Sequence, residues 1–155
     1  QQAADADVIL LTASEGDRVD LSHYQRMLAA AANSGVPCIC TNPDKIMLTR
    51  HGPKFAAGRI AELYEEMGGK VTWIGKPFPA IYEAALKAMG SPPRQRVLCV
   101  GDSPEHDITG AKSADLASAL VRTGIHADLS DRGLHALYVE HNASPDFILP
   151  GLVWQ

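Results

Sequence analysis

The chain has 155 residues, which is enough for one compact domain or two small ones. It is 46% hydrophobic, 21% charged and 6% aromatic, a globular composition that excludes a disordered, collagen-like or low-complexity chain. With 14 basic and 18 acidic residues the net charge is −4, and no run of Lys or Arg occurs. The charge pattern therefore does not favour nucleic-acid binding.

Cysteine usage and terminal composition indicate the compartment. Cys38, Cys40 and Cys99 stand in apolar, strand-like runs, where a free thiol behaves as a small buried hydrophobe. Cys38 and Cys40 share one face of a strand, but no second Cys or His pair stands nearby to complete a metal site. No apolar run approaches the ~20 residues of a membrane-spanning helix, and the first residues lack a signal-peptide pattern. We expect a cytoplasmic protein without membrane contact.

The first half of the chain alternates strands with helices. Hydrophobic periodicity predicts strands at 8–12, 36–40 and 71–74 and helices at 21–34 and 55–67, with a loop at 45–52. Gly35 and Pro37 end the first helix, and Gly68-Gly69 ends the second.

The second half continues the alternation. Helices are predicted from Pro79 to about Met89, from 104 or 105 to about 114, and at 130–140, and strands at 97–100, 117–121 and 147–149. The run 97–100 is typical of a strand buried on both faces, so we expect it at the centre of the sheet. The pattern predicts an α/β protein with a mostly parallel sheet, whose functional residues gather at the carboxyl ends of the strands.

Two carboxylates follow the strand at 97–100. Asp102 leaves the strand directly after Gly101, and Asp107 comes about one helical turn later. Two acids on that rim can hold a hard divalent cation such as Mg²⁺, one directly and one through a water or a neighbour. The alternative is a helix N-terminus whose acids complement the helix dipole and cap free amides.

A lysine follows the preceding strand in the same way. Lys76, between Gly75 and Pro77, leaves the strand at 71–74 at the same edge of the sheet. A lysine beside metal-binding carboxylates can neutralise a bound phosphoryl group. The alternative is an ordinary solvated lysine.

Other polar residues carry weaker signals. Asn42, Pro43 and Asp44 form a strand-terminal cluster, although these residues are also common turn formers. His106 lies inside the acidic loop, and from that position we expect an exposed side chain. The dinucleotide-binding, Walker and nucleophile-elbow motifs are absent from the sequence. Their absence argues against a dinucleotide-binding protein, a P-loop nucleotide hydrolase and an α/β-hydrolase.

Taken together, three motifs resemble subfamily IIA of the haloacid dehalogenase-like (HAD) superfamily, the sugar-phosphatase-like group whose cap is inserted between the second and third core motifs. The resemblance covers nearly the whole chain, to Trp154. It rests on Thr41-Asn42-Pro43-Asp44, on Gly75-Lys76-Pro77 with Pro79 and Tyr82, and on Gly101-Asp102 with Asp107 and Gly110.

The resemblance implies a fold and a site. The fold would be a Rossmann-like three-layer sandwich with part of an inserted α/β cap. Lys76 would hold the nucleophile and the phosphoryl group, Asp102 would ligate Mg²⁺, and Asp107 would support it. Asn42, Pro43 and Asp44 would lie on the substrate-facing loop of the cap. A small phosphorylated metabolite would be the ligand, and a homodimer through the cap is compatible with the group.

One departure from the family matters most. The attacking aspartate of the family stands in an Asp-x-Asp-Gly motif upstream of the cap, whereas the only Asp-x-Asp here, Asp5-Ala6-Asp7, precedes a strand and lacks the glycine. Relatives also carry a small hydroxyl residue where this chain has His106. We therefore expect a C-terminal part of a longer enzyme, with 1–70 as partial cap and 71–155 as the C-terminal half of the core.

Two functions remain open at this point. The first is a Mg²⁺-dependent phosphate-monoester hydrolase that acts through an aspartyl-phosphate in the intact parent, while this chain, without the nucleophile, is inactive. The second is a non-catalytic α/β module that binds phosphate or metal, or regulates another protein.

Overall fold

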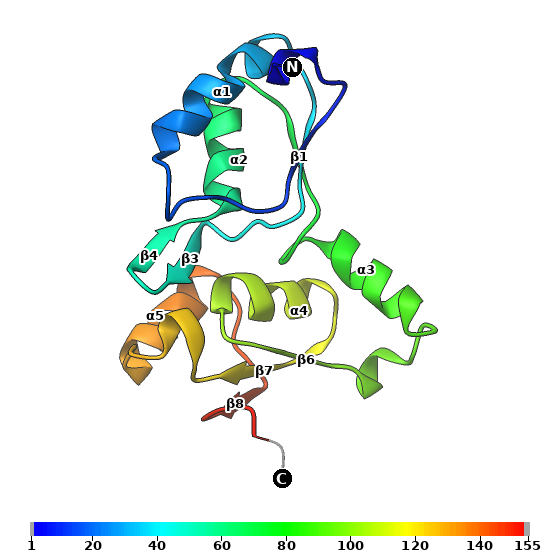
Figure 1. Ribbon diagram of the computed structural model, residues 1–155. Helices are drawn as coiled ribbons and strands as arrows, with labels where there is room; N and C mark the ends of the chain where they lie inside the picture. Colours follow the sequence, from blue (N-terminus) through cyan, green and yellow to red (C-terminus); the bar gives the residue numbers. More distant parts are fainter. Residues whose placement is uncertain (1, 154–155) are drawn as a thin grey trace. The chain divides into compact units, whose positions relative to one another are not determined.

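The computed structural model describes residues 2–153, so Trp154 lies outside the described part. The chain divides into two compact units, the first ending at Gly75 and the second beginning at Lys76 (Figure 1). The division falls after strand β5 (Val71–Trp73) because β5 pairs with a strand of the first unit. Among the described residues, no helix has both the length and the apolar character needed to cross a bilayer.

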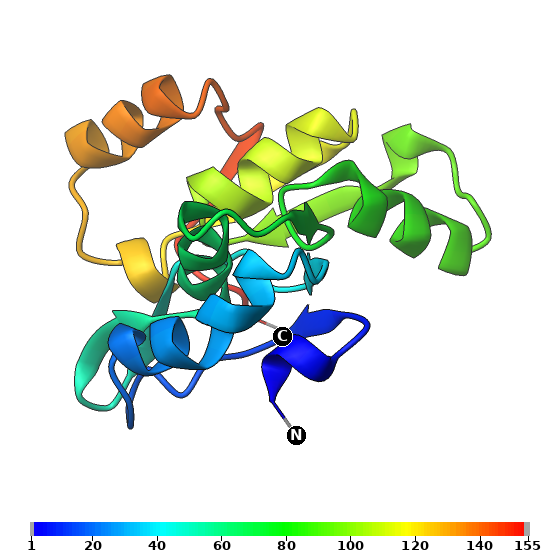
Figure 2. The same ribbon diagram turned by 90° about the horizontal axis from the view of Figure 1, so that it is seen from above.

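The first unit is built on a parallel three-stranded sheet. Its strands are β1 (Ile9–Leu11), β2 (Cys38–Cys40) and β5, in the order β1-β2-β5, so the expected strands are confirmed. Helix α1 (Leu21–Asn33) and helix α2 (Ala57–Glu66) contact each other and lie on one side of these strands (Figures 1 and 2). A short 3₁₀ turn, η1 (Ala3–Asp5), precedes β1.

The expected loop at 45–52 is wrong. This segment and the residues after it form an antiparallel hairpin of β3 (Ile46–Thr49) and β4 (Gly52–Phe55). Thr49 Oγ1 donates to the Gly52 carbonyl at 2.8 Å, and Gly52 takes a φ of +94°, which closes the turn. Because β4 reaches Phe55, helix α2 starts only at Ala57, two residues later than the periodicity predicts.

The core of the first unit is continuous. Tyr64, Ile60 and Leu28 pack with the thiols of Cys38 and Cys40, and all five side chains are buried. The Tyr64 hydroxyl donates to the Val36 carbonyl at 2.7 Å, so the ring is buried without leaving its polar atom unpaired. The two cysteines are therefore core residues, as the sequence predicts.

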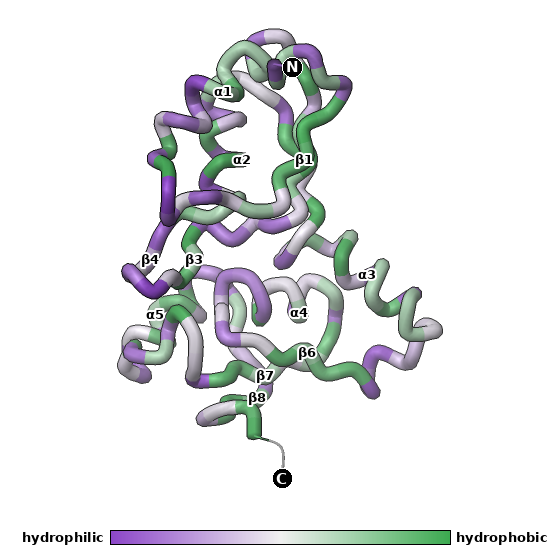
Figure 3. Tube along the Cα trace, in the orientation of Figure 1, coloured by the Kyte–Doolittle hydropathy of each residue, from purple (hydrophilic) through white to green (hydrophobic). Residues whose placement is uncertain are grey.

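The second unit has its own parallel sheet, of β6 (Leu98–Gly101), β7 (Ala117–Val121) and β8 (Phe147–Leu149). The order is β6-β7-β8, so the expectation that β6 is the central strand is wrong within residues 2–153. Leu98 and Val100 of β6 are 48% and 44% exposed. The tube is green along β6 in Figure 3, and the exposure of these two hydrophobic side chains corrects the expected burial of β6 on both faces.

Helices connect these strands in the expected places. They are α3 (Pro79–Ala88), α4 (Thr109–Ser113) and α5 (Asp131–Glu140), with short turns at η2 (Arg94–Arg96) and η4 (Gly124–His126). A π-helical turn, η3 (Pro104–Ile108), links β6 to α4. α3 contacts α4, and two small apolar clusters form the core, one around Leu86 and Ala111 and one around Ile108 and Leu120.

Candidate active site

An ion pair joins the predicted lysine to one of the predicted acids. Lys76 Nζ lies 2.6 Å from Asp107 Oδ1, although 31 residues separate them in the sequence. The lysine side chain is 48% exposed and the aspartate side chain 10%. The carboxylate is thus largely buried, whereas about half of the lysine side chain reaches solvent.

The second oxygen of Asp107 organises the end of β6. Asp107 Oδ2 accepts hydrogen bonds from the backbone N–H groups of Asp102 and Ser103, both at 3.1 Å. A Cβ on Gly101 would overlap the Asp107 carboxylate, so this approach requires glycine at position 101. Asp107 therefore holds in place the backbone that carries Asp102.

The turn after Asp102 is itself well ordered. Ser103 caps it, since its Oγ accepts from the backbone N–H of His106 at 3.2 Å. His106 is only 7% exposed, so the expectation of an exposed side chain is wrong. The segment forms the π-helical turn η3, which packs against β6 and β7, and does not stand out as a surface loop.

The sequence predicted no role for two side chains beside the ion pair, Tyr82 and Cys99. The Tyr82 hydroxyl lies 3.5 Å from the His106 carbonyl, and burial, followed by the charge of Asp107, raises the pKa of Tyr82 to about 12. Burial and then Asp107 also raise the pKa of Cys99. Both side chains therefore remain protonated near neutral pH. Tyr82 already stands in the family motif quoted with Lys76, and that motif is the signal that could have identified it.

A family model described as HAD-hydrolase-like matches residues 73–153, just over half of the chain. The chain belongs to this family. Its place in subfamily IIA is also supported by the relatives described next.

The relatives are phosphatases by name. A dihydroxyacetone phosphatase from Corynebacterium glutamicum is 34% identical over 99 residues, covering 63% of this chain and 36% of that protein. The ribonucleotide monophosphatase NagD from Escherichia coli is 31% identical, with 77% and 45% coverage. The solved p-nitrophenyl phosphatase from Archaeoglobus fulgidus superposes with a TM-score of 0.74 at 25% identity, over 97% of this chain and 56% of that one. The chain thus spans about half, or less, of these relatives.

The donor set suits a hard cation only in part. Asp102 offers carboxylate oxygens at the carboxyl end of β6, and oxygen is the ligand that Mg²⁺ prefers. Asp107 is already engaged with Lys76 and two amides, which suits a supporting acid better than a direct ligand. Between residues 2 and 153 no group of three or more His, Cys, Asp or Glu side chains is arranged to hold a metal. Asp102 would supply one ligand of an incomplete site.

Asn42, Pro43 and Asp44 belong to the first unit, where they follow β2. Asp44 N–H donates to Asn42 Oδ1 at 3.3 Å, an Asx-type turn, and the Asp44 carbonyl accepts from Gly58 N–H at 2.9 Å. Pro43 is buried, and a Cβ on Gly58 would overlap its carbonyl. The turn-forming interpretation of these residues is therefore correct, whatever else they do.

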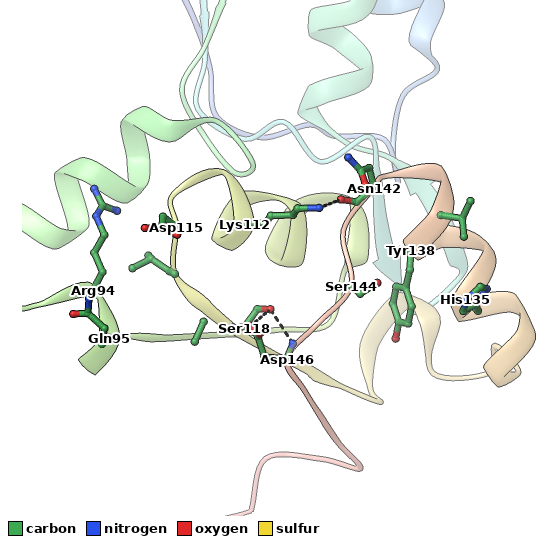
Figure 4. Close-up of a pocket in the computed structure, with 13 residues that line it drawn as sticks. Arg94, Gln95, Lys112, Asp115, Ser118, His135, Tyr138, Asn142, Ser144 and Asp146 are labelled. Atoms are coloured by element: carbon green, nitrogen blue, oxygen red, sulfur yellow. Dashed lines mark hydrogen bonds between the residues drawn. The ribbon is translucent and has the colours of Figure 1, made fainter.

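Two cavities of the second unit share Leu116 in their walls. A cavity of about 240 Å³, with largely apolar walls, is lined by Lys76, Asp107, Tyr82 and Cys99. Figure 4 shows another of about 840 Å³, lined by residues at or before the amino ends of the strands, such as Ser118 and Asp146. None of the predicted site residues lines that larger cavity. The ion pair of Lys76 and Asp107 therefore borders the smaller cavity.

Proposed function

We propose that this chain carries the lysine and the acids of a Mg²⁺-dependent phosphate-monoester hydrolase. The observation that supports this most directly is the 2.6 Å pair of Lys76 Nζ and Asp107 Oδ1, whose carboxylate also holds the backbone of Asp102. A cation and two carboxylates gathered at the carboxyl end of a parallel strand form an arrangement suited to phosphoryl transfer.

The charges of this cluster argue for a bound cation. Lys76 carries one positive charge, while Asp102 and Asp107 carry two negative charges when ionised, so the cluster alone would repel a phosphate. A divalent cation on Asp102 would reverse this balance. Bound there, Mg²⁺ would supply charge stabilisation of the phosphoryl oxygens. Lys76, whose side chain is half exposed, would contact the same oxygens and strengthen that contact as charge develops.

The attacking carboxylate would come from outside these 155 residues. One edge of β6 has no strand beside it within residues 2–153, and the cavity of about 240 Å³ that contains Lys76 and Asp107 also borders Val100 of β6. A strand pairing in parallel with that edge would end near the ion pair. Family members carry the attacking aspartate at the end of such a strand, and an aspartyl-phosphate intermediate would split hydrolysis into two easier steps.

For the first unit we propose a part of the cap. In this interpretation Asn42 and Asp44, which are partly exposed, contact the substrate, while the buried Pro43 and the Asx-type turn would fix the loop that carries them. The names of the relatives, a dihydroxyacetone phosphatase and a ribonucleotide monophosphatase, support a small phosphorylated metabolite as the substrate.

The test is a phosphate-release assay with para-nitrophenyl phosphate and MgCl₂. The 155-residue chain alone should show no turnover, because a lysine and metal ligands cannot replace a nucleophile. The protein produced from the full natural reading frame should be active, and Lys76→Ala should lower its kcat by roughly 100-fold or more, the loss expected for one preorganised electrostatic group.

Lys112→Ala is the matched control for this variant. It removes another exposed lysine of the second unit that lies outside the cluster, so its kcat should remain that of the wild type. Equal kcat values for Lys76→Ala and the wild type, with both folded, would show that Lys76 is an ordinary surface lysine. A natural reading frame without an upstream Asp-x-Asp-Gly would instead favour the non-catalytic module.

A further inference from the structure

The turn after β7 forms a wall beside Asp102. β6 and β7 are parallel neighbours, with Gly101 opposite Leu120, so both strands deliver their following residues to the same edge of the sheet. After β7 the chain enters the 3₁₀ turn η4, which starts at Gly124. Gly124 therefore lies beside Asp102 although 22 residues separate their numbers.

The space between these two residues accepts only a hydrogen atom on Gly124. A Cβ built on Gly124 would overlap Asp102 Oδ2 and would lie 2.6 Å from Asp102 Cγ, far inside van der Waals contact. The glycine also has a φ of +75°, in the left-handed region. The neighbour that an alanine would meet is the end of a short side chain, which can rotate away more easily than a backbone can move.

The two acids of the cluster are thus fixed in different ways. Asp107 is held by bonds, from Lys76 and from two backbone amides, whereas the Asp102 carboxylate is bounded by the bare Cα of Gly124. A substituent at position 124 would leave the bonds of Asp107 intact and turn the Asp102 carboxylate. The direction of one ligand oxygen would change without loss of the charge itself.

We propose that Gly124 is a positioning residue that sets the direction of the Asp102 carboxylate toward a divalent cation. The metal part of this inference rests on the proposed function, whereas the steric part concerns this chain alone. Groups that orient a metal ligand typically change metal affinity by about 10–100-fold when they are altered. Gly124 would act by leaving space, not by a bond.

The experiment compares Gly124→Ala with Gly90→Ala in the full chain. Gly90 lies in the same unit with a φ of +79°, and a Cβ there would meet no atom within 4 Å. Both variants share the backbone cost of alanine at positive φ, so Gly90→Ala should lower the melting temperature by about 2–4 °C. Gly124→Ala should lower it further, and the excess should vanish when Asp102→Ala is added. An additive double-mutant cycle would overturn the steric part.

The metal part has a separate readout. Titration of the full natural protein with Mn²⁺, followed by paramagnetic broadening of the Ser103 amide in NMR spectra, should show about 10-fold weaker binding for Gly124→Ala and wild-type binding for Gly90→Ala. Equal Mn²⁺ affinity in the two variants would overturn the positioning of the ligand. If wild type shows no broadening at all, the magnesium site of the proposed function fails, and a non-additive cycle still supports the steric part.

Discussion

Both units of this chain alternate strands with helices, but they bury their apolar side chains differently. The first unit has one continuous apolar core in which Tyr64 and Ile60 are fully enclosed. The second has two smaller clusters and leaves Leu98, Val100 and Phe147 of its sheet exposed. The ion pair and hydrogen bonds of the candidate site all lie in the second unit. The first unit also exposes Leu10 of its sheet, so the two units differ in the continuity of their cores, and the chemical groups lie in the unit whose core is divided.

The largest effect should come from the centre of the first core. Tyr64→Ala removes a fully buried ring and the hydroxyl that donates to Val36, and should lower the free energy of unfolding by about 4 kcal/mol. Urea denaturation followed by circular dichroism measures this change.

A pair of Tyr→Phe variants sharpens the same contrast. Tyr64→Phe loses one buried hydrogen bond and should cost about 1 kcal/mol. The hydroxyl of Tyr138, in the second unit, is buried without a hydrogen-bond partner in the described part of the chain, so Tyr138→Phe should be neutral or slightly stabilising. Equal losses in the free energy of unfolding for the two variants would show that the two buried hydroxyls are equally well satisfied in the two units.

The second prediction concerns the two acids. Asp107 should contribute more to stability, and Asp102 should contribute more to metal binding. Asp107→Asn weakens charge-assisted bonds to Lys76 and two amides, and should cost about 2 kcal/mol of stability. Asp102→Asn should change stability by no more than about 0.5 kcal/mol but should weaken Mg²⁺ binding more than Asp107→Asn does. Denaturation and metal titration of the full natural protein check this. If the same acid had the larger effect on both stability and metal binding, the proposed roles would be wrong.

Local sequence signals were sufficient for most elements. Gly and Pro punctuate the helices, as at Gly35 and Pro79, and the strand before Gly101 correctly places Asp102 at its carboxyl end. Lys76 and Asp107 do lie together, but the expected reason is wrong: β5 pairs in the sheet of the first unit and β6 in that of the second, so the two residues do not leave one sheet at a common edge.

Features that depend on distant contacts could not be predicted in this way. The hairpin at 46–55 has only a short alternation, and its register depends on cross-strand pairing of Ile46 with Phe55. The burial of His106 depends on the packing of η3 against β6 and β7. The edge position of β6 depends on which other strands are present to pair with it. Gly124 carries no local signal for its neighbour Asp102, because their contact follows from the alignment of β6 with β7.

The third prediction is a loss of stability that begins near pH 9 in the first unit, before Tyr82 of the second unit, whose pKa is raised from 10.0 to about 12, contributes at higher pH. Burial raises the pKa of Cys38 from 9.0 to about 11. Between these values the unfolded chain releases a proton that the folded chain keeps, so stability is full below pH 9 and falls as pH rises toward 11. The total loss should be on the order of 2 kcal/mol.

Denaturation at a series of pH values measures this dependence. Cys38→Ala should remove more of the alkaline decline than Cys99→Ala, because Cys38 is fully buried and Cys99 only half-buried. An identical decline in both variants would mean that the first core does not control the alkaline behaviour.

The smallest effect separates the two units most directly. Val36 of the first unit is 7% exposed and Val100 of the second is 44% exposed, so the same Val→Thr change tests each surface. At Val36 the new hydroxyl enters the core and should cost about 1–2 kcal/mol. At Val100 water can solvate the hydroxyl, so the free energy of unfolding should change by less than about 0.5 kcal/mol. A cost above 1 kcal/mol at Val100 in the 155-residue chain would show that this face of β6 is covered in solution, and the contrast in packing between the two units would then be wrong.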